Sequence, residues 1–370
     1  MSLFRRNRWF VLAGVVTLAF TVVSLMMPRG PALTAIIDFG YLLIALTIAV
    51  TMLLNAWSAQ GAARRFWALM GFGYLLWAFN QAGWAYYEVL SRKTVPDPWS
   101  MDIFLFLHLV PMIAAVGLRP HRSEGEPKFR VGTLDFLLLM VWWIFLYAFV
   151  VFPSQYVSVN VPVYDRNFGA LYLVESGVLV LVLGGVARGA PRGWKEIYLN
   201  LMAASAFYAI ASQAVNVAVT SGRYYSGCLY DAPLVGAVSW MAATILSARE
   251  WRLEVAQPNG DDTWSMMSLR LSMLAILSLP VLGLWAFLWD TSPPTTRMFR
   301  MFTVLTAMLV LGVFVFMRQY LQDQALIHLL EDSRRSFENE QRFRAIWYSE
   351  KSWPLSVSWS PGLRMRSIIP

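Results

Sequence analysis

Residues 299–317 read FRMFTVLTAMLVLGVFVFM, and residues 318–350 continue as RQYLQDQALIHLLEDSRRSFENEQRFRAIWYSE. The first segment is mostly apolar and close to the roughly 20 residues that a helix needs to cross a bilayer. The second is rich in charged residues and contains neither proline nor glycine. Because those two residues are the strongest helix breakers, the junction predicts a membrane-spanning helix that continues without a break into water.

Nine other apolar stretches precede this one. Hydrophobic residues make up 58% of the chain and charged residues only 14%, whereas a water-soluble protein carries about a quarter charged residues. The ten expected spans are 9–27, 33–57, 66–90, 101–118, 131–152, 166–187, 195–220, 230–248, 266–289 and 299–317. None has the alternation of a membrane strand, so the sequence predicts an all-α polytopic membrane protein with about ten transmembrane helices.

The formal net charge of +8 is explained by topology rather than by a nucleic-acid partner. If the N-terminus is cytoplasmic, fifteen Lys and Arg residues, from Arg5 to Arg270, flank the inner ends of the spans. Seven, from Arg29 to Arg300, flank the outer ends. Cytoplasmic loops are richer in basic residues, so we expect both termini in the cytoplasm, an even number of spans, and lipid as the surrounding partner.

Two four-span blocks match each other at an offset of about 130 residues. The matched features are Leu69-Met70 with Leu201-Met202, Gln81 with Gln213, and Asp102 with Asp231. Parallel repeats of this kind tend to place a binding site between the halves. The alternative is chance similarity between apolar helices, since few residues match. Spans nine and ten lie outside the repeat and would connect it to the charged tail.

Polar residues within spans are costly and therefore candidates for function. They are Asp38, Asn80, Gln81, His108, Asp135, Glu175, Gln213 and Asn216. Glu175 lies about ten residues into its span and is the strongest candidate for a buried carboxylate, paired with His108 or Gln213. For the amides, the alternative is ordinary interhelical hydrogen bonding. No two histidines share a helix face, so we expect His108 to be an interior histidine and predict no metal and no cofactor.

The most specific motif lies around the third and fourth spans. Trp84 and Glu88 are followed by Pro96-Asp97-Pro98-Trp99, Asp102, Pro111 and Gly117-Leu118. Aromatic rings favour the membrane interface, and Ser100 or Asp102 can cap the fourth helix by accepting its free amide protons. Capping and anchoring would explain the loop; the functional alternative is an outward-facing ligand pocket formed by Trp84, Glu88 and Asp102.

This W-x-x-Y-E, P-x-P-x-x-x-D-x-x-x-x-L and P-x-x-x-x-x-G-L pattern resembles the multi-span sensor region of bacterial signalling proteins. In that family the region precedes PAS domains and then GGDEF, GGDEF–EAL or histidine-kinase output domains. Residues 340–346, EQRFRAI, are similar to the start of a PAS domain. The resemblance covers residues 60–120 well, the tail moderately and the rest only as membrane architecture, and the family has no agreed ligand or catalytic residues to carry over.

The resemblance implies three parts: a membrane sensor domain over 1–317, a cytoplasmic signalling helix over 318–350 and an incomplete PAS-like stub over 351–370. Alternating residues from Leu355 to Met365, around Pro361-Gly362, predict a β-hairpin in the stub. The implied function is a non-enzymatic input module in the bacterial inner membrane, truncated before its output domain, that responds to an unknown stimulus. Motifs of phosphate-binding and hydrolytic sites are missing. A transporter or lipid-handling protein is the alternative, and a non-functional fragment of a larger gene is a third interpretation.

The charged tail also carries a possible dimer seam. Leu326, Leu330, Ser333, Phe337, Glu340 and Arg344 follow a 4-3-4-3-4 spacing. Only three of these are apolar, which is weaker than a coiled coil normally needs. A parallel homodimer through this helix and a single solvated helix both remain open.

Overall fold

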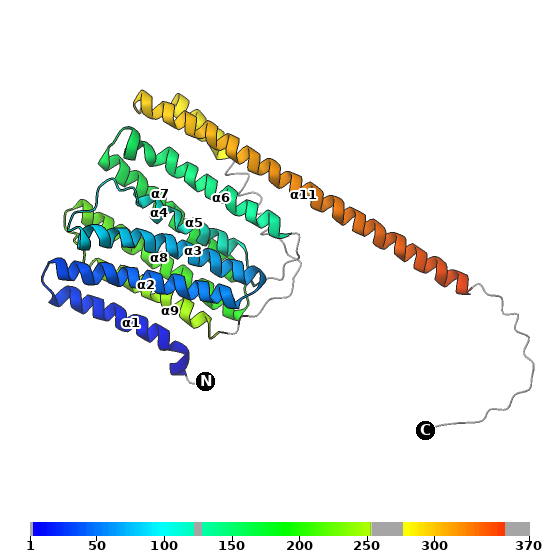
Figure 1. Cartoon of the computed structure of the whole chain (residues 1–370), viewed down its shortest axis with the longest axis horizontal. Helices are drawn as coiled ribbons and strands as arrows, with labels where there is room; N and C mark the ends of the chain where they lie inside the picture. The colour runs from blue at the N-terminus through cyan, green and yellow to red at the C-terminus, as the bar shows by residue number, and fades with distance from the viewer. Residues whose placement is uncertain (1–2, 122–127, 252, 254–276, 352–370) are drawn as a thin grey trace, which may run out of the picture. The chain divides into compact units, whose positions relative to one another are not determined.

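The computed structural model describes residues 3–121, 128–251, 253 and 277–351. Within these ranges every regular element is a helix and none is a strand (Figure 1). The all-α prediction is therefore confirmed for the described part of the chain. The predicted β-hairpin and the first half of the expected ninth span lie outside it.

A helix lies at each of the ten expected spans. The α-helices are α1 Leu3–Met26, α2 Pro31–Ser58, α3 Gly61–Ala85, α4 Asp102–Leu107, α5 Leu109–Gly117, α6 Lys128–Val150, α7 Val161–Arg188, α8 Arg192–Thr220, α9 Asp231–Ala248 and α11 Pro294–Lys351. Two single-turn π-helices, η1 Tyr86–Leu90 and η2 Pro153–Val157, follow α3 and α6. A further apolar helix occupies Leu277–Leu288.

Six helices in the described residues are long and apolar enough to cross a membrane. They are Asn7–Met26, Pro31–Ser58, Val161–Arg188, Arg192–Thr220, Asp231–Ala248 and Pro294–Gln324. The apolar helices Asp102–Gly117, Phe136–Val150 and Leu277–Leu288 are shorter. The helices thus agree with a membrane protein, while the count of ten crossings remains a prediction.

Proline and asparagine define several helix boundaries. Asn160 accepts a hydrogen bond from the Val163 amide at 3.2 Å and so caps α7, which has a proline in its first turn. The expected fourth span is split at His108 into α4 and α5. Pro111 explains the break, because it has no N–H to donate to the Leu107 carbonyl and its ring crowds that group.

The bundle is formed by α1 to α9 (Figure 1). Its closest helix pairs are α2 with α3, α7 with α8, α8 with α9, and α1 with α9; α3 and α7 also pack on α5, and α2 on α9. Phe66, Trp143, Trp194 and Tyr198 are among its largest fully buried side chains. Large apolar side chains are exposed elsewhere, Leu181 and Ile210 among them, and so much exposed apolar surface suits lipid rather than water.

A second apolar cluster joins α6 to α11. It consists of Leu138, Phe145, Phe149, Leu279, Ala286, Val304, Ala307 and Leu311. The opposite side of α6 carries Trp143 and Tyr147, which pack into the main core. Helix α6 therefore has one face on the bundle and another on α11.

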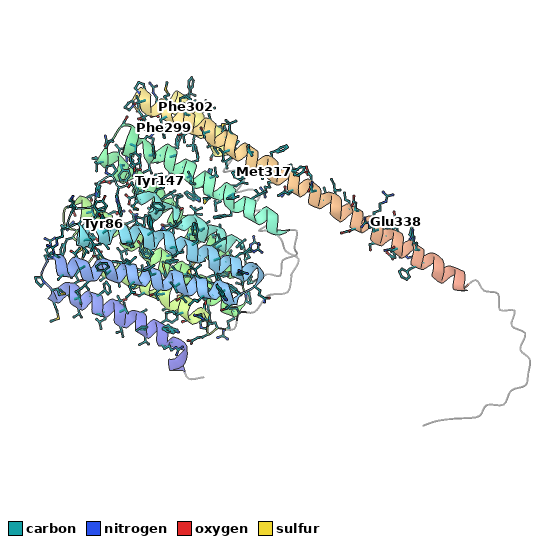
Figure 2. The ribbon with its side chains drawn as sticks, viewed as in Figure 1. Tyr86, Tyr147, Phe299, Phe302, Met317 and Glu338 are labelled. Carbon is teal, nitrogen blue, oxygen red and sulfur yellow. The ribbon has the colours of Figure 1, made fainter. Side chains whose placement is uncertain are left out.

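The chain divides into two compact units, Met1–Arg318 and Gln319–Pro370, and α11 runs through their boundary. Exposed apolar side chains such as Phe302 line the first part of α11, whereas Glu338 lies in its charged part (Figure 2). In the second unit Leu326, Leu330 and Phe337 are 57%, 61% and 61% exposed.

Candidate functional site

The three residues of the predicted outward-facing pocket have different partners. Trp84 packs edge to face on Trp99, with 5.4 Å between ring centroids. Glu88 accepts a hydrogen bond from the Ser226 hydroxyl at 2.5 Å. Asp102 accepts one from Tyr164 of α7. Glu88 and Asp102 thus belong to two distinct polar clusters.

The loop before α4 is held by side chains of other helices. Asn80 donates to the Met101 carbonyl at 3.1 Å, and Gln155 donates to the Trp99 carbonyl at 2.7 Å. The N-cap of α4 is Met101, and no side-chain cap hydrogen bond is made there, so the predicted cap by Ser100 or Asp102 is not formed. Its carboxylate binds the Tyr164 hydroxyl instead.

Asp231 anchors the loop before α9 in a similar way. Its carboxylate accepts the Gly227 amide at 2.8 Å and the Tyr224 hydroxyl at 3.1 Å, and its carbonyl accepts the Tyr41 hydroxyl at 3.1 Å. Gly227 has φ +94°, and a Cβ there would lie 2.5 Å from Leu33 Cγ, so glycine is required for this turn. Asp38 is buried, and its Oδ2 makes no hydrogen bond to any described residue.

Glu175 is fully buried in α7, as its position within the span predicts, but neither carboxyl oxygen has a hydrogen-bond partner among the described residues. The expected pairing with His108 or Gln213 is therefore not formed. Gln81 and Gln213 are both half-buried, and Asn216 is exposed. The side chain of Asp135 lies outside the described part.

A small cavity of about 30 Å³ lies where α3, α5, α7, α8 and α9 meet. Its aromatic wall consists of Tyr74, Trp77, His108, Tyr172 and Tyr208. Its other polar or sulfur-bearing residues are Met112, Ser176, Ser205 and Met241. Except for His108, these residues were not singled out from the sequence, because aromatic and methionine residues are also ordinary core residues.

The cavity wall is tightly connected. Trp77 stacks on His108 at 6.1 Å and meets Tyr208 edge to face at 5.8 Å, measured between centroids. The Tyr74 hydroxyl donates to Met241 Sδ at 2.7 Å. Nδ1 of His108 bonds the Leu105 carbonyl, which can only accept, so in the neutral ring Nε2 carries the lone pair. The indole N–H of Trp77 has no partner among the described residues.

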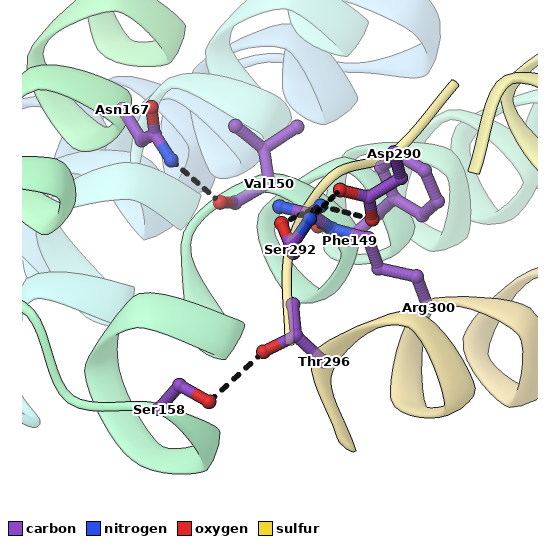
Figure 3. A network of polar contacts seen from close by, with 8 residues as sticks. All are labelled: Phe149, Val150, Ser158, Asn167, Asp290, Ser292, Thr296 and Arg300. Atoms are coloured by element: carbon purple, nitrogen blue, oxygen red, sulfur yellow. Dashed lines mark hydrogen bonds and ion pairs between the residues drawn. The ribbon is translucent and has the colours of Figure 1, made fainter. Parts of the chain in front are cut away.

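A buried ion pair fixes the start of α11 (Figure 3). Arg300 Nη1 lies 2.6 Å from Asp290 Oδ2, and the two side chains are 11% and 3% exposed. Arg300 also donates to Ser292 Oγ at 3.1 Å and to the Phe149 carbonyl of α6 at 3.2 Å. Close by, Thr296 of α11 donates to Ser158 at 3.0 Å. We call Asp290, Ser292, Thr296 and Arg300 the α11 anchor.

Electrostatics in the α11 anchor favour the charged carboxylate. Burial alone would raise the pKa of Asp290, but hydrogen bonds from Ser292 and Arg300 and the charge of Arg300 together hold that pKa below its ordinary value. The sequence analysis placed Arg300 only among the basic residues at the outer ends of the spans, and it did not single out Asp290. Their pairing depends on the turn between the two helices, which no motif signals.

Comparison of the chain with family models, with curated proteins and with solved structures yields no match. The function therefore has to be argued from the residues of this chain.

Proposed function

We propose that residues 1–318 form a multi-pass input module in the inner membrane of a bacterium and that α11 relays its state to a cytoplasmic partner domain. The observation that carries this proposal is the continuity of α11. The helix is apolar enough to cross a membrane from Pro294 to Gln324, and it then continues to Lys351, with exposed charged side chains as far as Arg344. A helix without a break can transmit a shift or rotation from one end to the other.

The proposal includes ten crossings with both termini in the cytoplasm. Support comes from the coincidence of helices with all ten expected spans and from the excess of Lys and Arg at the expected inner ends. The stub after residue 350 would belong to the partner domain, as the resemblance to PAS sequences implies.

The proposal also includes two parallel four-helix halves. Tyr74 and Trp77 of α3 line the cavity together with Ser205 and Tyr208 of α8, 131 residues later. This is one residue off the interval of 132 that relates Gln81 to Gln213, so these residues are neighbours of equivalent positions. Leu109 and Met112 of α5 line it with Val238 and Met241 of α9, 129 residues later, the same interval that separates Asp102 from Asp231. Equivalent positions of two halves would meet in this way around a pseudo-two-fold axis.

Helix α6 is the proposed connection between this cavity region and α11. Phe106 of α4 contacts Trp143 and Tyr147 of α6, with ring centroids 5.8 and 5.3 Å apart. The other face of α6 packs on α11, and the α11 anchor ties Arg300 to the Phe149 carbonyl. A change in bundle packing would therefore reach α11 through α6 and the α11 anchor.

A distance measurement within one molecule tests the relay. Spin labels at Ala190→Cys and Phe337→Cys, in the Cys228→Ser chain and diluted with unlabelled protein, report how the tail stands relative to the bundle. We expect Arg300→Met and the milder Thr296→Val to change the distance distribution, because both loosen the α11 anchor. Arg297→Met, at an exposed position of the same turn, is the matched control. If all three variants give the same distance distribution as the labelled chain without these substitutions, the relay is contradicted.

A transporter or lipid-handling protein is the second candidate. Glu175 favours it, because a buried carboxyl group without a hydrogen-bond partner in an apolar span is typical of substrate and proton pathways. Substrate accumulation in vesicles that is abolished by Glu175→Gln, with an unchanged tail distance, would favour transport over signalling.

A further inference from the structure

We propose that the central cavity binds one soft monovalent metal ion, Cu(I), through Met112 Sδ, Met241 Sδ and His108 Nε2. The ion would be the ligand of the input module, so its signalling role rests on the proposed function, whereas the binding itself does not. The scattered histidines predict no metal site by themselves, but the thioethers of the cavity change that expectation.

The first argument is the position of the two methionines. Met112 of α5 and Met241 of α9 occupy equivalent places in the two halves, and both line the same cavity. An ion near the pseudo-two-fold axis would therefore meet one thioether from each half. His108 lies one helical turn before Met112 and lines the cavity beside it.

The second argument is the chemistry of the donors. Thioether sulfur and imidazole nitrogen without carboxylates favour Cu(I) over hard cations, which prefer oxygen ligands. Among the residues that the structure describes, no group of three His, Cys, Asp or Glu side chains could hold a metal ion. The usual donor sets for zinc, calcium and magnesium are therefore missing there.

The third argument is size. A volume of about 30 Å³ is roughly that of one water molecule, which is enough for an ion but too small for an organic ligand. Gly73 helps to form this compact wall. A Cβ at Gly73 would lie 2.6 Å from the His108 carbonyl oxygen and 2.8 Å from Met112 Cγ, so glycine lets α3 approach the two proposed donors.

The fourth argument is charge. Glu175 of α7 directly precedes the cavity residue Ser176 in the sequence. It is fully buried and has no hydrogen-bond partner in the described structure. Glu175 does not itself line the cavity, but a monovalent cation there would favour the charged form of a nearby carboxyl group. The faces of Trp77, Tyr172 and Tyr208 would also favour a cation.

Direct titration tests the site. The purified full-length protein in detergent is titrated with Cu(I) against a chromophoric Cu(I) chelator, and X-ray absorption identifies the ligands. We expect one equivalent of Cu(I) bound by sulfur and nitrogen. Met112→Leu and Met241→Leu should each lower the affinity at least tenfold, since leucine keeps the volume but removes the donor. Met70→Leu, at a buried methionine of α3 that does not line the cavity, should leave it unchanged.

Three outcomes would overturn the binding site: no Cu(I) bound, Cu(I) bound equally well by both cavity variants, or binding of K⁺ or ammonium in place of Cu(I). Thermal unfolding of each variant in detergent checks that it is folded. If Cu(I) binds but leaves the distance between the spin labels at positions 190 and 337 unchanged, the site stands but the ion is not the input signal. Absence of binding, with the expected response to Thr296→Val, would overturn the site while keeping the relay.

Discussion

Phe66 and Tyr198 lie 132 positions apart in the sequence, and their rings meet edge to face with 6.1 Å between centroids. The same interval separates Gln81 from Gln213. Phe66 lies on α3 and Tyr198 on α8, and in the proposed repeat of two four-helix halves they are equivalent positions in direct contact. Both rings also contact Trp194, which makes this group a junction between α3 and α8.

Phe66→Ala should be strongly destabilising, by about 3 kcal/mol or more, because it leaves a large cavity in a fully buried site. Tyr198→Ala should cost a similar amount, since it removes the other half of the junction. Unfolding in mixed micelles measures both. Phe302→Ala, at an exposed position of α11, is the control and should have little effect. Equal stability of all three variants would mean that α3 and α8 are not held together at this junction.

Gly73→Ala should destabilise the bundle by about 1–3 kcal/mol, the usual cost of overpacking, because its Cβ would lie 2.6 Å from the His108 carbonyl oxygen. Backbone cannot move aside as easily as the end of a side chain. Gly312→Ala in α11, where no atom lies within 4 Å of the new Cβ, is the matched control. Comparison of the two unfolding curves in micelles checks the prediction; a harmless Gly73→Ala would show that α3 and α5 can separate freely.

The α11 anchor should make stability depend on acid pH. The pKa of Asp290 is lower in the folded protein than its ordinary value of about 3.9. A group of this kind contributes stability that is present above the unfolded pKa and is lost as the pH falls through the folded pKa. The window therefore lies below about pH 4.

Asp290→Asn should be less stable than the unmodified chain at pH 7 by about 3 kcal/mol, because Arg300 loses its buried partner. The difference should begin to narrow as the pH is lowered to 3, because Asp290 takes up a proton in the unfolded chain there and in the folded chain only at a lower pH. Thermal unfolding in detergent at the two pH values measures this. Asp323→Asn, at an exposed site, is the control. If the difference in stability between Asp290→Asn and the unmodified chain stays constant with pH, Asp290 is not the titrating partner of Arg300.

The tail should associate in parallel pairs. Apolar surface is exposed along the tail helix at Leu326, Leu330 and Phe337, and the structure describes no other helix or strand after Gln319 that could cover it. A second copy in the same membrane would present the same seam in the same direction. Disulfide formation at Phe337→Cys in the Cys228→Ser chain should therefore be efficient. Glu338→Cys, one position off the seam, should react more slowly. Equal rates at both positions would indicate a solvated single helix.

The positions of the helices follow from the sequence because lipid leaves the backbone few alternatives to a helix. The burial of Glu175 was also predictable from its place within a span, because an ionisable side chain in a span turns to the bundle interior rather than to lipid. Its lack of a partner, the cavity lined by Met112 and Met241, and the pairing of Asp290 with Arg300 were not. Those features depend on which helices become neighbours, and in lipid that choice is made by close packing rather than by any pattern of polar and apolar residues.

The split of the fourth span shows the same division between local and tertiary information. Pro111 predicts a distortion in that span by itself, whereas the role of Asp102 depends on Tyr164, more than sixty residues later. The sequence therefore predicted a cap, and the folded chain uses the carboxylate for an interhelical hydrogen bond. Local chemistry determined the residue type at this position, and packing determined its partner.

Side-specific labelling of single cysteines tests the central claim most directly, because a relay from membrane to cytoplasm requires a defined topology. In intact cells carrying the Cys228→Ser chain, a membrane-impermeant thiol reagent should label Gly222→Cys, in the loop before α9. It should label Ser2→Cys and Phe337→Cys only after the cells are opened. Labelling of residues 2 and 337 from opposite sides of the membrane would contradict the account.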